Sequence, residues 1–254
     1  MVDRQRRGIV QNGDQRAAEL GVLLLDANAL TIPGAVSHPE SFGLPTTMVT
    51  VSGATAQAIT TPLNDQSGLK GLYREAAVAL AADGVHALTT NCGFTLPFQQ
   101  ELQQSTRLPV VSSALLLLPA LNDVYGAGLG VLTYDVSVLR RMLERSWDGG
   151  HASVAAVDVR ESQAWGALEK EAGSPVDTPA MCDDLISIAE AFVSRHDLAA
   201  LLLECTGFAP FAEALRMHLH VPIFDHITIV RFLLGAQLQP AEMKVNECKG
   251  GRPP

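Results

Sequence analysis

Apolar residues along this chain fall into two recurring patterns, short unbroken runs and longer stretches with helical spacing. Short runs that end in a polar residue, such as GVLLLD (21–26), VHALTT (85–90) and AALLLE (199–204), are typical of buried strands. Between these runs, apolar residues recur every three to four positions, as from Leu69 to Leu80, which predicts amphipathic helices. Strands that alternate with helices predict right-handed βαβ units on parallel sheets, and therefore an α/β fold flanked by helices.

Two segments of the chain repeat the same arrangement around a cysteine. TTNCGFTLPF (89–98) and LLLECTGFAPF (201–211) each continue an apolar run, and in both the cysteine is followed, after four residues, by Pro-Phe. The repeat predicts two similar lobes related by a pseudo-two-fold axis, with Cys92 and Cys205 at equivalent strand ends. Because ligands bind beyond the carboxyl ends of parallel strands, we expect the active site in the cleft between the lobes.

The predicted elements divide the chain into a leader, two lobes and a return segment. We expect a polar leader (1–20), a first lobe with Cys92 (21–115), a second lobe with Cys205 (116–222), and a return to the first lobe with a C-terminal tail (223–254). The leader holds a basic cluster, and short basic leaders are usually solvated tails. The loop 27–45 is long for a connection between compact elements, which favours a functional role for it.

The composition limits the partners and the location of the protein. The 254 residues carry a net charge of -9, which argues against a nucleic-acid surface. No apolar run reaches the ~18 residues of a membrane helix, and no secretory signal opens the sequence, so we expect a cytoplasmic protein that does not bind membranes. Four cysteines without a C-x-x-C pattern predict reduced thiols, and the histidines lack metal-ligand spacing, so we expect no metal. A homo-oligomer fits this size and class, although no interface can be assigned.

The surroundings of the four cysteines differ. A free cysteine is often only a small buried apolar residue, and this interpretation suits Cys182 and Cys248. Cys92 and Cys205 instead end a strand, have a glycine within two residues, and precede a helix with proline in its first turn. The positive end of a helix favours a thiolate, and cysteine pKa values there fall from ~8.5 to roughly 3.5–7.5. Such a pair predicts two groups that exchange protons with a substrate at neutral pH.

Polar residues at other strand ends are further candidates. Asp26 ends the first strand, and Thr133 and Tyr134 end the first strand of the second lobe, so all three are expected to line the site unless they only cap helices. Asp225 and His226 follow a short strand. His226 would be the natural partner of a cysteine that acts as a nucleophile.

With Asn91 before the first cysteine and Thr206 after the second, the chain resembles the aspartate/glutamate racemase superfamily over roughly 21–235. That superfamily includes amino-acid racemases, hydantoin racemase, maleate cis–trans isomerase and arylmalonate decarboxylase. The resemblance implies a mechanism without a cofactor, in which a small anionic or amide-containing substrate binds between the lobes. One cysteine removes the α-proton as a thiolate and the other protonates the opposite face as a thiol.

Carried over residue by residue, the resemblance makes Cys92 and Cys205 the acid/base pair. It further implies that one group of residues binds the substrate's carboxylate or the developing enolate: Asn91, Gly93, Thr206, Gly207, and the hydroxyls of Thr133 and Tyr134. The physical requirement agrees with this assignment, because a planar carbanion must lose a proton from one face and regain it on the other.

The chain departs from the glutamate racemases at three places. It has Asp26-Ala27 where they have Asp-Ser, Gly93-Phe94 where they have Asn-Thr, and Thr206-Gly207 where they have Thr-His. Phe94 and Phe208 instead indicate an apolar wall in the site. The first hypothesis is a racemase or epimerase of an amino acid, small carboxylate or hydantoin. The alternatives are a maleate-type cis–trans isomerase with a covalent cysteine adduct, and a non-catalytic ligand-binding module on the same fold.

Overall fold

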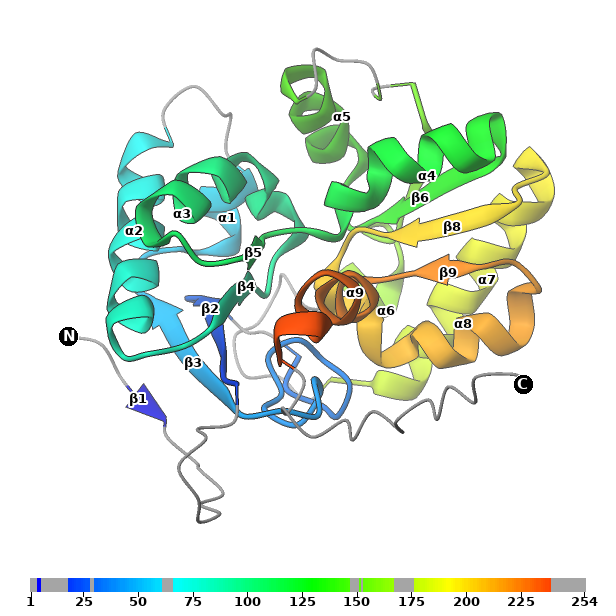
Figure 1. Cartoon of the computed structure of the whole chain (residues 1–254). Helices are drawn as coiled ribbons and strands as arrows, with labels where there is room; N and C mark the ends of the chain where they lie inside the picture. Colours follow the sequence, from blue (N-terminus) through cyan, green and yellow to red (C-terminus); the bar gives the residue numbers. More distant parts are fainter. Residues whose placement is uncertain are drawn as a thin grey trace, which may run out of the picture.

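The computed structural model describes residues 4–5, 18–27, 30–60, 66–146, 151, 153–166 and 176–238. Two α/β lobes lie side by side, each with a sheet flanked by helices (Figure 1). In spatial order, the first sheet contains β1 (Arg4–Gln5), β3 (Thr46–Val51), β2 (Leu20–Leu25), β4 (Ala87–Thr90) and β5 (Val110–Val111), and the second contains β7 (Ala155–Asp158), β6 (Leu129–Thr133), β8 (Ala200–Leu203) and β9 (Ile223–Phe224). Neighbouring strands are parallel, except that β1 is antiparallel to β3.

The helices follow the predicted apolar spacing. The α-helices are α1 (Ala56–Thr60), α2 (Ser67–Ala82), α3 (Gln99–Thr106), α4 (Leu118–Tyr125), α5 (Val136–Arg145), α6 (Gln163–Gly166), α7 (Thr178–His196), α8 (Ala212–Leu219) and α9 (His226–Leu238). The described residues also form the short 3₁₀ helices η2 (Gly93–Phe98), η3 (Ala114–Leu117), η4 (Gly126–Gly128) and η7 (Thr206–Phe211). In α2, for example, Tyr73, Ala77 and Leu80 share one buried face, since they are three to four residues apart.

The predicted pseudo-two-fold repeat is confirmed element by element. The order β4, η2, α3, β5 in the first lobe recurs as β8, η7, α8, β9 in the second. Both 3₁₀ helices have six residues, and both following α-helices have eight. Each α-helix ends in a left-handed residue, Arg107 at φ 59° and His220 at φ 48°. The two cysteine segments are therefore equivalent in backbone structure as well as in sequence.

The two lobes share part of their apolar core. The core of the first lobe continues into the second, where it takes in residues such as Val131, Leu139 and Leu202. A second core covers the other face of the second sheet. Helix α9, at the junction of the lobes in Figure 1, packs on β5, η3 and η7 and adds Ile229 and Val230 to the first core. Because this core is continuous, the carboxyl ends of the two sheets are held in a fixed relation.

The structure corrects two of the predicted boundaries. Arg4–Gln5 of the leader, expected to be a solvated tail, pairs with Met48 and Val49 as strand β1. Strand β9 pairs with β8 and so belongs to the second sheet, which places the return to the first lobe after Phe224 and not at residue 223. As a sequence pattern, an apolar dipeptide after a proline is compatible with a strand of either sheet. Only the strand pairing shows to which sheet it belongs.

The segment 30–45 joins the lobes. Leu30 and Ala35 are buried in the second core, whereas Val36 and Phe42 are buried in the first. Gly34 has φ +89°, and a Cβ there would lie 3.1 Å from the Cα of Pro210. This part of the long loop is therefore packed between the lobes beside η7, which accounts for its length structurally.

None of the described helices is long and apolar enough to cross a membrane. The cytoplasmic location and the homo-oligomer stay predictions.

Candidate active site

Both cysteines stand at the carboxyl end of a central, fully buried strand. Cys92 follows β4 and Cys205 follows β8, and each is half-buried and immediately precedes a 3₁₀ helix. Two backbone N–H groups of that helix lower the pKa of each thiol, those of Phe94 and Thr95 for Cys92 and those of Gly207 and Phe208 for Cys205. The N–H groups of Thr95 and Phe208 also donate to the backbone carbonyls of Cys92 and Cys205, at 3.2 and 3.0 Å. The repeat in the sequence thus produces two thiols in matching hydrogen-bonding environments.

The helix behind each cysteine differs from the predicted one. Pro97 and Pro210 lie inside the 3₁₀ helices, and the α-helices begin only at Gln99 and Ala212. The thiols consequently receive individual N–H groups and not the end of a long helix. Proline is tolerated there because it lacks the N–H that a longer ladder would need.

Two crossed contacts bring the cysteine segments together. Thr206, which follows Cys205, donates its hydroxyl proton to the backbone carbonyl of Asn91, which precedes Cys92. In the opposite direction, Gly93, which follows Cys92, lies against Glu204, which precedes Cys205. Negative charge on Cys92 raises the pKa of Cys205, so the two thiols are close enough to interact electrostatically.

Asn91 is 6% exposed and keeps one hydrogen-bonding group unused. Its Oδ1 accepts from the backbone N–H of Leu25 at 2.7 Å, and its own N–H donates to the carbonyl of Leu23 at 3.1 Å. The Nδ2 group is buried without a partner. Because an unpaired buried donor is costly, Nδ2 is a natural place for an oxygen atom of a bound ligand.

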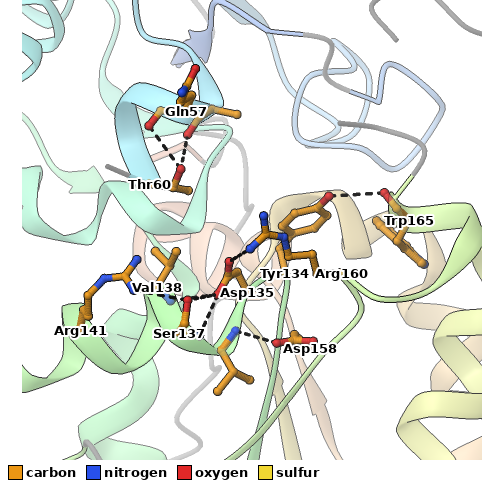
Figure 2. A network of polar contacts seen from close by, with 12 residues as sticks. Gln57, Thr60, Tyr134, Asp135, Ser137, Val138, Arg141, Asp158, Arg160 and Trp165 are labelled. Carbon is orange, nitrogen blue, oxygen red and sulfur yellow. Dashed lines mark hydrogen bonds and ion pairs between the residues drawn. The ribbon is translucent and has the colours of Figure 1, made fainter. Parts of the chain in front are cut away.

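Thr133 and Tyr134 do not present free hydroxyls to a substrate. Thr133 is fully buried, and its Oγ1 donates to Oε2 of Glu204 at 2.7 Å. The backbone N–H of Tyr134 donates to the same oxygen at 3.4 Å, and the Tyr134 hydroxyl donates to the carbonyl of Trp165 at 3.4 Å. Figure 2 shows this Tyr134–Trp165 contact beside Asp135 and Arg160. The Thr133 hydroxyl and the Tyr134 backbone N–H thus hold a carboxylate of the protein itself, while the Tyr134 hydroxyl contacts Trp165.

That carboxylate, Glu204, was missed in the sequence analysis. It is only 1% exposed, although it ends the apolar run of β8. A Cβ on Gly93 would lie 2.1 Å from its Oε1 and 2.2 Å from its carbonyl oxygen, so only glycine leaves room for it. A glutamate directly after Leu-Leu-Leu and directly before the second cysteine was the available signal.

The pKa values of these groups oppose the prediction of acidic thiols. Burial, followed by the charge of Glu204, raises the pKa of Cys92 to about 12, although the N–H groups of Phe94 and Thr95 act in the other direction. The same two causes raise the pKa of Cys205 well above its usual range, and the charge of Cys92 adds to them. Removing water from the thiols therefore outweighs the N–H donors.

Glu204 is itself shifted. Burial raises its pKa to about 7, against the hydrogen bonds from Thr133 and Tyr134, and the charge of Asp135 raises it further. Asp135 caps α5 through the N–H groups of Ser137 and Val138, and it pairs with Arg160 at 2.7 Å (Figure 2). A carboxyl that titrates near neutrality thus stands next to two thiols that hold their protons.

The remaining predicted site residues are Asp26, Phe94 and Gly207. Asp26 is exposed at the end of β2 and accepts from the N–H of Gly53 at 2.8 Å, which fixes the turn after β3. Phe94 is buried in the first core. A Cβ on Gly207 would lie 3.5 Å from the Cys205 sulfur, 3.6 Å from Trp165 and 3.7 Å from Leu30. Trp165 and Leu30 therefore form an apolar wall beside Cys205.

His226 does not face a cysteine as a general base would. Its Nε2 lies 2.7 Å from Oγ1 of Thr89, which donates to the carbonyl of Val111, so the ring donates to Thr89. Burial lowers the pKa of His226 to about 4, and the ring is neutral at neutral pH. Among the described residues, Thr89 is its hydrogen-bond partner, and this contact ties α9 to β4.

A groove between the lobes is lined in part by residues of η2. It encloses about 720 Å³ and is lined by residues of both lobes, including Lys70, Leu96, Gln99, Met142 and Arg145. Neither cysteine belongs to its lining, so the proton chemistry is not placed in this groove. Within the described part of the chain, no three His, Cys, Asp or Glu side chains gather as metal ligands would.

A known protein family matches the part of the chain that contains both cysteine segments. The family model of Asp/Glu/Hydantoin racemase matches residues 37–230, about three quarters of the chain. The chain belongs to this family. The match includes both cysteines, Asn91 and Glu204.

Curated proteins similar to this member of the Asp/Glu/Hydantoin racemase family are named as lyases. A dimethylsulfoniopropionate lyase of Durusdinium sp. clade D is 28% identical over 233 residues, covering 85% of this chain and 74% of that protein. Dimethylsulfoniopropionate lyase 5 of Emiliania huxleyi is 29% identical over 252 residues, covering 91% of this chain but only 48% of that protein. This chain thus spans about half to three quarters of the length of these relatives.

Solved structures show the same fold. Allantoin racemase from Klebsiella pneumoniae has a TM-score of 0.60 at 18% identity, over 90% of this chain and 92% of that one. Unliganded arylmalonate decarboxylase has a TM-score of 0.55 at 16% identity, over 87% and 92% of the two chains. The predicted α/β fold with two similar lobes is confirmed. The fold is thus common to racemases and a decarboxylase, so the choice of reaction must come from the site.

Proposed function

We propose that this protein is a cofactor-independent lyase that removes the α-proton of a small zwitterionic carboxylate, with dimethylsulfoniopropionate as the substrate. The observation that carries the proposal is the pair of coupled thiols at matching strand ends. The names of the curated relatives supply the substrate. The isomerase activity expected from the sequence becomes the second candidate.

The proposed reaction is a β-elimination. A thiolate takes the proton from the carbon next to the substrate's carboxylate, and the electron pair of that C–H bond forms the new carbon–carbon double bond. The bond from the β-carbon to sulfur breaks, and its electron pair leaves with sulfur. The products are acrylate and neutral dimethyl sulfide. The leaving group needs no proton, so one base is sufficient.

We assign the role of base to Cys92. Both thiols have raised pKa values, but that of Cys205 is raised by Glu204 and also by charge on Cys92. If one thiol ionises, the other is held protonated by that charge. Cys205 then remains a thiol that can donate a hydrogen bond to the developing enolate.

The two charges of the substrate fit the two sides of the site. The unpaired Nδ2 of Asn91 can donate to the carboxylate, and the N–H groups of η2 and η7 lie beside the thiols. For the other charge, the carboxylate of Glu204 is negative and attracts the positively charged sulfonium group. A dianion such as maleate would place a second carboxylate against Glu204, which disfavours the maleate-type isomerase.

Racemisation is the second candidate because of the symmetry of the thiols. Each receives two backbone N–H groups in a 3₁₀ turn of the same length, as two-base proton transfer on opposite faces requires. An amino acid is also zwitterionic and meets the same charges. A non-catalytic binding module would give no reason for two thiols in matching environments.

The deciding experiment is proton NMR in deuterated water with dimethylsulfoniopropionate, amino acids, monosubstituted hydantoins and maleate as separate substrates. We expect acrylate and dimethyl sulfide from the first, with loss of the reaction in Cys92→Ala. Exchange of the α-proton of an amino acid or hydantoin, without elimination, would establish the racemase. Silence with all of them, in a protein with a normal melting transition, would contradict both and favour the binding module.

A further inference from the structure

The position of Glu204 leads beyond the proposed reaction. Its side chain is buried between the two cysteine segments, directly before Cys205 and packed on the residue directly after Cys92. Thr133 and Tyr134 hold Oε2, while Oε1 lies over Gly93. Attraction of the sulfonium group alone does not require a carboxylate buried between the two cysteine segments.

Three features show that this placement is specific. Burying a carboxylate is costly unless hydrogen bonds compensate, and here Thr133 at the end of β6 and the next residue, Tyr134, supply two. A side chain at position 93 would expel it, so the first cysteine segment is shaped to receive it. The charge of Glu204 also acts on both thiols, and in each case it is the largest cause after burial.

We infer that Glu204 is a positioning residue of the cysteine pair, whose carboxylate adds to burial in keeping Cys92 and Cys205 protonated until substrate binds. This inference rests on the proposed function of the two thiols. In the empty site, the carboxylate disfavours a second negative charge and thereby protects the thiols from oxidation and alkylation. A substrate with a cationic group near Glu204 offsets that charge and allows Cys92 to ionise next to the α-proton.

The charged and titratable groups around Glu204 come from three elements. They are Cys92 at the end of β4, Cys205 at the end of β8, and Asp135 after β6 with its ion-pair partner Arg160. Asp135 and Glu204 repel each other, and Arg160 offsets Asp135. Replacing Glu204 by glutamine therefore removes one negative charge while the donors Thr133 and Tyr134 keep an oxygen to bind.

The test is the pH dependence of iodoacetamide alkylation, followed at each cysteine by mass spectrometry without substrate. We expect Glu204→Gln to lower the midpoints of Cys92 and Cys205 by about one pH unit or more, since a nearby charge shifts a pKa by roughly 1–3 units. Cys182, on α7, is the internal reference and should keep its midpoint. Unchanged midpoints at 92 and 205 would overturn the inference, as would an equal shift of all three.

A matched pair of variants guards against a folding defect. If Glu204→Gln shows no cooperative melting transition, Glu204→Asp and Glu204→Asn are compared, because they have the same shape and differ in charge. Midpoints that are lower in Asn than in Asp support the inference, and equal midpoints contradict it. Because alkylation needs no turnover, the outcome is separate from that of the proposed function. Where the enzyme is active, the rising limb of its pH profile should also move to lower pH in Glu204→Gln.

Discussion

The two cysteine segments share a backbone but differ in the residues on either side of the cysteine. Before the cysteine stands Asn91 in one lobe and Glu204 in the other, and both side chains are buried. After it stands Gly93 in one and Thr206 in the other, and each contacts the residue before the opposite cysteine. The backbone symmetry sets the two thiols at equivalent strand ends, and the side-chain asymmetry gives the site a donor end and an acceptor end.

This difference separates what the fold provides from what the reaction needs. Two equivalent thiols suit a reaction in which both faces of a carbon are treated alike. A donor at Asn91 and a carboxylate at Glu204 suit a substrate with a fixed orientation, negative at one end and positive at the other. The comparison therefore favours a directional reaction on a symmetric scaffold, and each prediction below tests one side of it.

The largest expected effect is an unequal loss of activity in the two cysteine variants. We expect Cys92→Ala to lower kcat/KM for β-elimination by about 10³, within the range for loss of a general base. Cys205→Ala should lose about tenfold, because the departing sulfide needs no proton and only a hydrogen bond is missing. Initial rates of dimethyl sulfide release measure both, with Cys182→Ala as the control. Equal losses at the two positions would contradict the directional assignment and show that the elimination needs both thiols to the same extent.

The second effect concerns stability and the buried carboxylate. Since the pKa of Glu204 in the folded protein is about 7, above its ordinary value of 4.5, the protonated form is favoured by folding. This contribution is fully present below pH 4.5 and is lost as the pH rises through 7. The free energy of unfolding of Glu204→Gln should therefore match that of the wild type near pH 4.5 and exceed it at pH 7 by on the order of 3 kcal/mol at most, which urea denaturation at each pH measures. A constant difference between pH 4.5 and 8 would show that the carboxyl does not titrate in this range.

Much of this site could be predicted from the sequence, because it depends on local patterns. The apolar runs place Cys92 and Cys205 at strand ends, and the repeated Pro-Phe identifies them as equivalent. The predicted boundary at residue 223 separates β9 from the second lobe, whereas β9 pairs with β8, because a dipeptide carries no sign of its pairing partner. The local pattern thus predicts that a residue lies at the end of a strand, but it does not predict which distant residues pack against it.

Glu204 illustrates the same limit within the site. A glutamate after Leu-Leu-Leu can be a solvated strand end or a buried carboxylate, and the difference depends on Gly93, which is 111 positions away in the sequence. The pKa of the thiols was predicted in the wrong direction for a related reason. Helix-end donors are visible in the sequence, whereas the burial and the long-range charge that outweigh them are properties of the assembled lobes.

The third prediction tests the crossed contact through the two glycines. A Cβ at Gly93 would meet Glu204 at 2.1 Å, whereas the nearest atom to a Cβ at Gly207 is the Cys205 sulfur at 3.5 Å, an ordinary contact. Gly93→Ala should destabilise the protein by about 1–3 kcal/mol, as overpacking does, and Gly207→Ala by less than about 0.5 kcal/mol. Urea denaturation of the matched pair measures the difference. Similar midpoints for the two variants would show that Glu204 moves aside at little cost, and its position would then not be fixed by Gly93.

The smallest effect tests the donor end alone, without catalysis. Asn91→Asp keeps an oxygen to accept from the N–H of Leu25 but replaces the unpaired Nδ2 donor with a second oxygen. Binding of propionate, which has the carboxylate but no leaving group, should weaken about tenfold, the loss expected for one hydrogen bond to a charged group. Titration by NMR gives the Kd, and the variant's melting temperature shows whether the turn is intact. Unchanged affinity would place the carboxylate elsewhere, and the donor of the asymmetric pair would then have to be sought among the N–H groups of η2 and η7. Weakened affinity, together with a lowered thiol midpoint in Glu204→Gln, would establish both ends of the site independently of the reaction that it catalyses.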